Sequence, residues 1–367
     1  MEEWIKCPLG DILNFRRGHD LPKTSMIPGD IPVAGSNGII GFHNVSTPIS
    51  FCITIGRSGN VGTPYIYDKC WAHNTVLYID DYKGNDPKYL YYLLKTLPLA
   101  SFGGGSAVPT LNRNHIHPLE VDFCRDIELQ KKIAGILSKI DDKIEINNQI
   151  NDNLEQQAQN IFNYYFINNP IELGSYSEGV LTDIAVYLNG LAMQKFRPEG
   201  SDFGLPVLKI KELGQRSCDN NSDRCSSLIK EEYIVNDGDV IFSWSGTLLV
   251  DLWCGGKCGL NQHLFKVTSD TYPKWFYYFW TKHHLDNFIR VAKDKAVTMG
   301  HIKRTELEKA NIIVPTQDKL SEINRIMSPI ITKIINHRVE MRKLGQLRDI
   351  ILPQLMSGEL KINEIDC

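Results

Sequence analysis

A long helical pattern constrains this chain of 367 residues more than any other feature. Between residues 131 and 166, apolar residues recur at alternating steps of four and three, the 3.5-residue period of a coiled coil. Asp126 suits the N-cap position, and Asn168-Asn169-Pro170 suits the end. A helix of roughly 40 residues is about 60 Å long, which is typical of a spacer. The predicted seam residues are Ile133, Leu137, Ile140, Ile144, Asn147, Leu154 and Ile161.

The same pattern returns near the C-terminus, with Thr316 as the expected N-cap and Gly358 as the expected end. The two registers match position for position, with His337 where the first helix has Asn147. This match predicts a duplication whose two helices pair antiparallel as a coiled coil. Two ordinary amphipathic helices, each packed on its own domain, remain the alternative. The second seam comprises Ile323, Met327, Ile330, Ile334, His337, Met341, Leu344 and Ile351.

The repeat extends upstream of both helices. "LGDI" from Leu9 answers "LTDI" from Leu181, "CITIGRSGNVG" from Cys52 answers "VIFSWSGTLL" from Val240, and "WAHNTVLYI" from Trp71 answers "GLNQHLFKV" from Gly259. The order of the matching strings does not change, which indicates two related globular repeats, each followed by a helix.

The repeats predict a mixed α/β (α+β) fold with two tandem units, each with a curved, mainly antiparallel sheet and one aromatic helix. The strand order is not readable from the sequence. The expected boundaries are a first unit at 1–125, a spacer helix at 126–170, a second unit at 171–315, a second helix at 316–360 and a tail at 361–367.

Composition excludes several classes of protein. With 42% hydrophobic residues, the chain has enough apolar side chains to bury cores. It has no apolar run long enough for a membrane span and no signal pattern, and its nine cysteines lack the spacing of a secreted framework. We therefore expect a cytoplasmic protein. The net charge of −3 argues against a simple electrostatic DNA binder.

Several strings carry a resemblance that covers essentially the whole chain. They are "PVAGSNGIIGFHN", "ITIGRSGNVG", "GLNQHLF", "QLRDIILPQLMSGEL" and the helix "QKKIAGILSKIDDKIEINNQINDNLEQQAQNIFNYYF". In this order and duplicated, they resemble the specificity (S) subunits of Type I restriction-modification systems. The chain departs from the usual pattern at Cys124-Arg125 and at "GSYSEGV", both in linkers.

The resemblance implies a non-catalytic subunit with two target recognition domains that read a bipartite, asymmetric sequence in double-stranded DNA. It implies that the paired helices set the spacing and that two methyltransferase subunits dock around them, with restriction subunits as further partners. No cofactor is expected on this chain. S-adenosylmethionine, ATP and Mg²⁺ are expected on the partner subunits.

The expected DNA contacts lie in polar loops, where Arg pairs with guanine, Asn or Gln pairs with adenine, and Lys binds phosphate. The alternative for each residue is a solvated loop position. In the first unit the candidates are Arg16, Arg17, Lys23, Ser36, Asn37, Arg57, Ser58, Asn60, His73, Asn112, Arg113 and Asn114. In the second they are Lys209, Lys211, Ser243, Trp244, Ser245, Gln262, His263, Lys293, Lys295, Lys303 and Arg304.

Other patterns are weaker. Cys254 and Cys258, with His263 and the pair Cys218 and Cys225, match no standard zinc spacing, so no metal site is predicted. "GRSGNVG" lacks the order of a phosphate loop, and no residues are predicted to be catalytic. Two other functions remain open: a reader fused to an enzyme, which the length disfavours, and a coiled-coil scaffold for protein ligands. Salt-dependent DNA binding would distinguish a reader from a scaffold.

Overall fold

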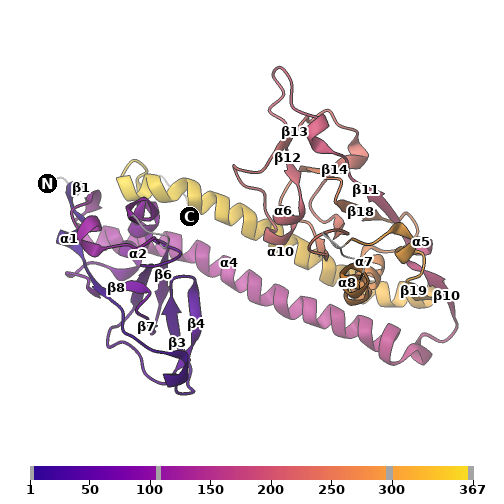
Figure 1. The fold of residues 1–367 in the computed structure, drawn as a ribbon, viewed down its shortest axis with the longest axis horizontal. Coiled ribbons are helices and arrows are strands. Elements are labelled where there is room, and N and C mark those ends of the chain that lie inside the picture. The colour runs from indigo at the N-terminus through magenta and orange to yellow at the C-terminus, as the bar shows by residue number, and fades with distance from the viewer. Residues whose placement is uncertain (1–3, 105–108, 295–300, 363–367) are drawn as a thin grey trace. The chain divides into compact units, whose positions relative to one another are not determined.

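The computed structural model describes residues 4–104, 109–294 and 301–362. The chain forms two compact units, shown with their elements in Figure 1. Unit 1 combines Met1–Asp142 with Gly345–Cys367, and unit 2 is Lys143–Leu344. Each unit therefore contains one repeat and part of both long helices.

Unit 1 has three small sheets. The pair β1–β9 is antiparallel, the four-stranded sheet has the order β2-β8-β5-β6, and the three-stranded sheet has the order β4-β3-β7 with β3 and β7 parallel. The strands are β1 (Trp4–Pro8), β2 (Asn14–Arg17), β3 (Ile31–Gly35), β4 (Gly38–His43), β5 (Cys52–Gly56), β6 (Pro64–Tyr67), β7 (Trp71–Ala72), β8 (Val76–Asp81) and β9 (Glu120–Cys124). The helices are α1 (Leu9–Ile12), η1 (Lys23–Ser25), α2 (Pro87–Thr96), η2 (Leu99–Phe102) and α3 (Arg113–Ile116).

Unit 2 repeats this plan. Its pair β10–β19 is antiparallel, and its sheets have the orders β11-β18-β15-β16 and β13-β12-β17-β14, with β12 and β17 parallel. The strands are β10 (Tyr176–Val180), β11 (Val186–Asn189), β12 (Leu205–Leu208), β13 (Arg224–Cys225), β14 (Ile234–Val235), β15 (Val240–Ser243), β16 (Leu249–Leu252), β17 (Cys258–Leu260), β18 (Leu264–Thr268) and β19 (Asn311–Pro315). The helices are η4 (Pro170–Leu173), α5 (Leu181–Ile184), η5 (Met193–Lys195), α6 (Ile210–Gln215), η6 (Glu231–Tyr233), α7 (Lys274–His283), α8 (Leu285–Asp294) and α9 (Arg304–Leu307).

The predicted fold class, two tandem α/β units with mainly antiparallel sheets, is confirmed. The aromatic helices are α2 and α7, and their apolar faces are buried in the cores of units 1 and 2. The α2 helix begins where Asp86 accepts a hydrogen bond from the backbone N–H of Tyr89 at 2.8 Å and Pro87 presets the first turn.

One close backbone approach identifies equivalent positions in the two units. A Cβ on Gly18 would lie 2.0 Å from the carbonyl oxygen of His73, and a Cβ on Gly190 would lie 2.2 Å from that of Asn261. Both glycines follow the first strand of the four-stranded sheet. Only glycine permits this contact, so the same crossing is built into both repeats.

The two long helices are α4 (Ile127–Phe162), continued by the π-helical turn η3 (Asn163–Asn168), and α10 (Gln317–Ser357). The predicted caps are confirmed. The carboxylate of Asp126 accepts from the N–H of Glu128 at 2.9 Å, and the hydroxyl of Thr316 accepts from the N–H of Lys319 at 3.4 Å. Gly358, with φ of 75°, ends α10 in the left-handed conformation.

Polar side chains join α4 to α10 within each unit. In unit 2, Asn147 donates to Glu340 at 2.8 Å, and the side chains of Asn151 and His337 are hydrogen-bonded at 3.2 Å. In unit 1, Arg348 pairs with Asp141 at 2.7 Å. From Asn147 to Asn151 the residue number rises along α4, whereas the bonded residues run from Glu340 down to His337 along α10. These segments of unit 2 are therefore antiparallel.

The residues of the predicted seam are buried to differing degrees. The buried seam residues are Ile133, Leu137, Asn147, Ile323, Met327 and Ile334. The partly buried ones are Ile140, Ile144, Leu154, Ile161, Ile330, His337, Met341, Leu344 and Ile351. Both helices carry many charges, and none of the helices in the described ranges is apolar enough over sufficient length to cross a membrane.

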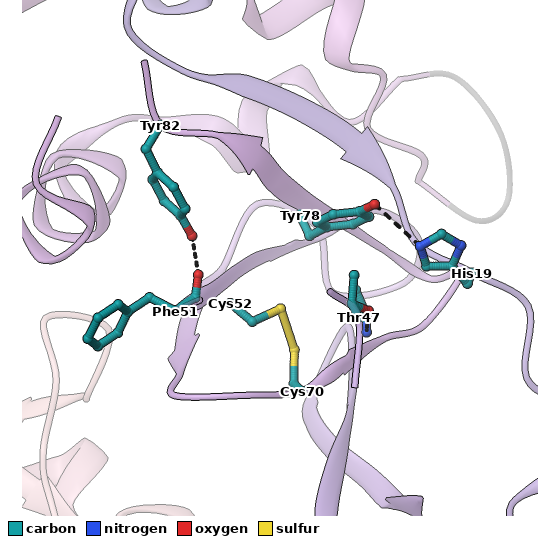
Figure 2. Close-up of a disulfide and its surroundings, with 8 residues drawn as sticks. His19, Thr47, Phe51, Cys52, Cys70, Tyr78 and Tyr82 are labelled. Carbon is teal, nitrogen blue, oxygen red and sulfur yellow. Dashed lines mark hydrogen bonds between the residues drawn. A yellow bond between two sulfur atoms is a disulfide. The ribbon is translucent and has the colours of Figure 1, made fainter. Parts of the chain in front are cut away.

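A disulfide that the cysteine spacing did not predict lies in unit 1 (Figure 2). It joins Cys52, at the start of β5, to Cys70, just before β7, with 6.0 Å between the Cα atoms. The two sulfurs share a small core with Ala34, Ala72 and Tyr78. Figure 2 also shows the Tyr78 hydroxyl at 3.3 Å from Nε2 of His19. The antiparallel pairing of β5 with β6 places Cys52 opposite Tyr67 and so brings it near Cys70.

Candidate nucleic-acid interface

An arginine-rich cleft of about 420 Å³ opens on the surface of unit 1. Five of the predicted DNA contacts line it: Arg16, Arg17, Arg57, Asn112 and Arg113. The other lining residues are Leu77, Thr110 and Leu111, so the lining contains four arginines and no carboxylate. The arrangement suits an anionic ligand.

The four-stranded sheet of unit 1 assembles this cleft. Arg16 and Arg17 end β2, and Arg57 directly follows β5. Both strands pair with β8 at Leu77, which lies opposite Arg17 on one side and Ile55 on the other. Arg113 begins α3, and its guanidinium donates to the carbonyl of Phe15 in β2 at 3.0 Å. Residues far apart in the sequence therefore meet around one sheet position.

Backbone hydrogen bonds fix the loop that presents Arg57. The N–H groups of Arg57 and Ser58 donate to the carbonyl of Thr75 at 2.8 and 3.2 Å, and the hydroxyl of Ser36 donates to the same oxygen at 2.7 Å. The N–H of Leu111 donates to the carbonyl of Arg57 at 2.7 Å. The backbone N–H and the carbonyl of Arg57 are thus both hydrogen-bonded, which holds the backbone from which its side chain extends.

The positive charge of the cleft is not neutralised. Burial, and then the charge of Arg17, lowers the pKa of Arg57, because both disfavour its protonated form. Among residues 4–104, 109–294 and 301–362, Arg16, Arg17 and Arg57 form no ion pair with a carboxylate. A bound anion would relieve the repulsion between these guanidinium groups.

Unit 2 places Trp244 where unit 1 has Arg57. The N–H of Ile302 donates to the carbonyl of Trp244 at 3.1 Å, just as that of Leu111 donates to Arg57. The isolated bridges Ser58–Thr110 and Ser245–His301 also correspond. An ungapped match of the two strings would have placed Ser245 opposite Arg57. The structure corrects that alignment by one residue.

Trp244 lies in a neutral, aromatic environment. Its indole N–H donates to the side-chain oxygen of Asn189 at 3.0 Å, and its ring centroid is 5.9 Å from that of Phe265 and 6.1 Å from that of His263. The hydroxyl of Ser245 is 3.0 Å from Nδ1 of His263. Sequence reasoning missed Asn189, although it ends β11 as Arg17 ends β2.

Other predicted contacts in unit 2 lie against carboxylates. Lys209 pairs with Asp223 at 2.5 Å, and Lys211 pairs with Asp219 at 3.5 Å. A small cavity of about 30 Å³ is lined by Lys209 and Asp223 together with Arg224. The guanidinium of Arg224 donates to the carbonyls of Phe203 and Gly204. These cations therefore have partners within the unit.

The remaining candidates differ in accessibility. Ser36, Ser243 and Ser245 are buried, and the hydroxyl of Ser243 donates to the carbonyl of Thr247 at 2.8 Å, so it holds a turn. Ser58, His73 and Gln262 are partly buried. Lys295 lies outside the described residues. The exposed candidates outside the cleft are Lys23, Asn37, Asn60, Asn114, Lys211, His263, Lys293, Lys303 and Arg304.

The cysteines and histidine considered for zinc do not form one site. Cys254 hydrogen-bonds to the carbonyl of Ile335, and burial raises its pKa to about 11. Burial raises the pKa of Cys258, and the neighbouring Cys218 raises it further. Within the described ranges, no group of three or more His, Cys, Asp or Glu side chains is arranged to hold a metal ion.

The protein is thus a duplicated α/β protein, in which each repeat is followed by a long helix and unit 1 carries a cleft that favours an anion. A family model described as the Type I restriction modification DNA specificity domain matches residues 1–156 and 178–343. The chain belongs to this family, which confirms the resemblance found in the sequence.

Curated relatives and a solved structure agree with this assignment. The chain is 28% identical over 306 residues to the Type I restriction enzyme MjaIX specificity subunit of Methanocaldococcus jannaschii, covering 76% of this chain and 70% of that one. It is 20% identical over 357 residues to the HindI specificity subunit of Haemophilus influenzae, covering 75% and 77%. The crystal structure of a Type I S subunit from M. genitalium has the same fold, with a TM-score of 0.67, 14% identity and 96% coverage of both chains.

Proposed function

We propose that this chain reads a bipartite, asymmetric DNA sequence for a Type I restriction-modification complex and has no catalytic activity of its own. The observation that carries the proposal is the duplicated fold, in which the sheets β2-β8-β5-β6 and β11-β18-β15-β16 have the same order. Two equivalent modules on one chain suit a target with two half-sites.

The two half-sites should differ in sequence because the modules differ where a ligand would bind. Arg57 and Trp244 occupy the same position with opposite chemistry. A guanidinium recognises guanine edges and phosphates, whereas an indole offers an aromatic face and one N–H donor. One chain therefore suits an asymmetric target.

The long helices suit the role of a spacer. The 36 residues of α4 span about 54 Å, more than one turn of duplex DNA at about 34 Å. Both α4 and α10 contribute residues to both units, and polar pairs such as Asn147 with Glu340 fix their register. In this proposal the helices determine the unread gap between the half-sites.

The chemistry would reside in other chains. We propose that two methyltransferase subunits assemble on the helices, that restriction subunits join them, and that S-adenosylmethionine, ATP and Mg²⁺ bind to those partners in the cytoplasm. Basic surfaces of the partners would supply part of the phosphate binding, which reconciles the net charge of −3 with DNA binding.

Long-read modification sequencing of the host genome, with the gene intact and deleted, tests the proposal. We expect deletion to remove methylation from one split, asymmetric motif, and re-expression of the chain to restore it. The motif would give both half-sites and the gap. The parent strain must express both the intact gene and its methyltransferase. If every methylated motif then persists after the deletion, the proposal fails.

A further inference from the structure

Within the part of the chain that the structure describes, the guanidinium groups of the unit 1 cleft have no carboxylate partner of the kind that an internal structural role would supply. Arg57 is partly buried beside Arg17, and its backbone is bonded to Thr75 and Leu111. Arg113 is tied to the carbonyl of Phe15. The backbone of Arg57 and the guanidinium of Arg113 are therefore held in place before any ligand arrives, which reduces the entropy cost of binding an anion.

Unit 2 carries less positive charge at the equivalent positions. Arg17 lies opposite Leu77, and Asn189 lies opposite Phe265 at the same point of the sheet. The residues before them, Arg16 and Leu188, correspond in the same way, and Trp244 replaces Arg57. Of the four arginines, only Arg113 has a cationic counterpart, Arg304, at the start of α9.

The geometry points to a phosphodiester of the DNA backbone as the ligand of the unit 1 cleft, with no matching phosphate site at the equivalent positions of unit 2. This inference rests on the proposed function. Guanidinium groups from β2, from the loop after β5 and from α3 line one open cleft. They suit the several oxygens of a phosphate, which take charge-assisted hydrogen bonds from more than one donor. Unit 1 would therefore supply more of the salt-dependent affinity than unit 2, where only Lys303 and Arg304, the counterparts of Asn112 and Arg113, carry positive charge at the equivalent positions.

The experiment measures the affinity of the assembled complex, including its methyltransferase subunits, for a duplex that carries its methylated motif, over a series of salt concentrations. Each phosphate contact contributes about 0.9 to the slope of log affinity against log salt. We expect Arg57→Gln and Arg17→Gln each to reduce the slope by up to about 0.9. A fourfold rise in salt would then weaken the variant about 3.5-fold less than the unaltered complex.

Three further variants make the result specific. Arg57→Lys should keep most of the slope, because an ammonium still pairs with a phosphate. Trp244→Gln should lower the affinity by a similar factor at every salt concentration and leave the slope unchanged. Lys88→Gln removes one positive charge from an exposed position of α2, outside the cleft and the long helices, and should leave the slope unchanged. Thermal unfolding of each variant checks that it folds.

Several outcomes would overturn the inference. Unchanged slopes for Arg57→Gln and Arg17→Gln in folded complexes would exclude a phosphate in the cleft. A relaxed base preference without a change in slope would instead assign Arg57 to a guanine edge. If the unaltered complex shows neither a methylated motif nor salt-dependent DNA binding, the proposed function itself fails, and the two failures are thus distinguishable.

Discussion

Arg57 and Trp244 accept the same backbone hydrogen bond in two copies of one fold, from the N–H of Leu111 at 2.7 Å and from that of Ile302 at 3.1 Å. The backbone is preserved while the side chain changes from a cation to an aromatic ring. A duplicated scaffold can thus present unlike chemistry at equivalent points. The predictions below test the scaffold and the spacing that it sets.

The first prediction concerns the spacer. Removing seven residues from each helix, 143–149 from α4 and 339–345 from α10, preserves the 3.5-residue period of both. The spacer shortens by about 10 Å, so we expect the gap in the methylated motif to shorten by about three base pairs. Modification sequencing of cells that express the variant measures the gap. Removing four residues from each helix breaks the period and should abolish methylation, and an unchanged gap after the seven-residue deletion would contradict the spacer role.

The second prediction concerns a buried ion-pair network in unit 2. Arg338 pairs with Asp251 at 2.8 Å and with Glu155 at 2.7 Å, and the side chains of Arg338 and Asp251 are only 5% and 7% exposed. Burial alone would lower the pKa of Arg338, but these two carboxylates outweigh it and raise the pKa. Arg338→Met removes the buried cation and, among the described residues, leaves Asp251 paired only with the exposed Arg216. It should lower the free energy of unfolding by about 3 kcal/mol.

Denaturant unfolding measures this loss. The exposed substitution Arg325→Met serves as the control and should change the free energy of unfolding by less than about 0.5 kcal/mol. Combining Arg338→Met with Asp251→Asn removes both opposite charges, so we expect a smaller loss than the sum of the two single effects. Additive losses would show that the pair is not coupled.

The third prediction concerns a polar residue at the helix seam. Asn147 is fully buried, and its side-chain oxygen has no hydrogen-bond partner among the residues that the structure describes. Asn147→Leu removes that penalty and adds apolar burial, so the free energy of unfolding should rise by about 1–2 kcal/mol. The neighbouring exposed substitution Asn148→Leu should have little effect in the same thermal or denaturant measurement. A destabilised Asn147→Leu variant would show that the bond to Glu340 outweighs the buried oxygen.

The fourth prediction concerns pH. Burial lowers the pKa of His284 below its usual 6.5, and the neighbouring charge of His283 lowers it further, against the raising effect of its bond to Asn311. Below about pH 6.5 the unfolded chain binds a proton that the folded chain does not. The stability that neutral His284 contributes to the folded state is therefore fully present above that pH. It is lost as the pH falls towards the pKa that His284 has in the folded chain.

The His284→Gln variant should consequently lose less stability than the original chain between pH 7 and pH 5. Its absolute stability at pH 7 is a separate quantity and serves as the reference for each curve. His115→Gln, at an exposed position of α3, is the matched control. It should change the pH dependence of stability less than His284→Gln does. An equal pH dependence in His284→Gln and the original chain would refute the assignment.

The sequence by itself determined what depends on local spacing. The 3.5-residue period and the caps Asp126, Thr316 and Gly358 predicted the long helices, because helical hydrogen bonds and cap bonds join residues only a few positions apart. The duplicated strings predicted two related α/β units. The predicted DNA contacts stay predictions, although five of them line one cleft.

Only the tertiary structure decided which distant residues meet. Strand order, the bond between Cys52 and Cys70, and the gathering of Arg17 and Arg57 around Leu77 all depend on pairing between segments far apart in the chain. No local propensity encodes such pairing, because strands are stabilised by cross-strand neighbours. The equivalence of Arg57 with Trp244 likewise required the hydrogen bonds of the folded chain, since differences in loop length shift the aligned strings by one residue.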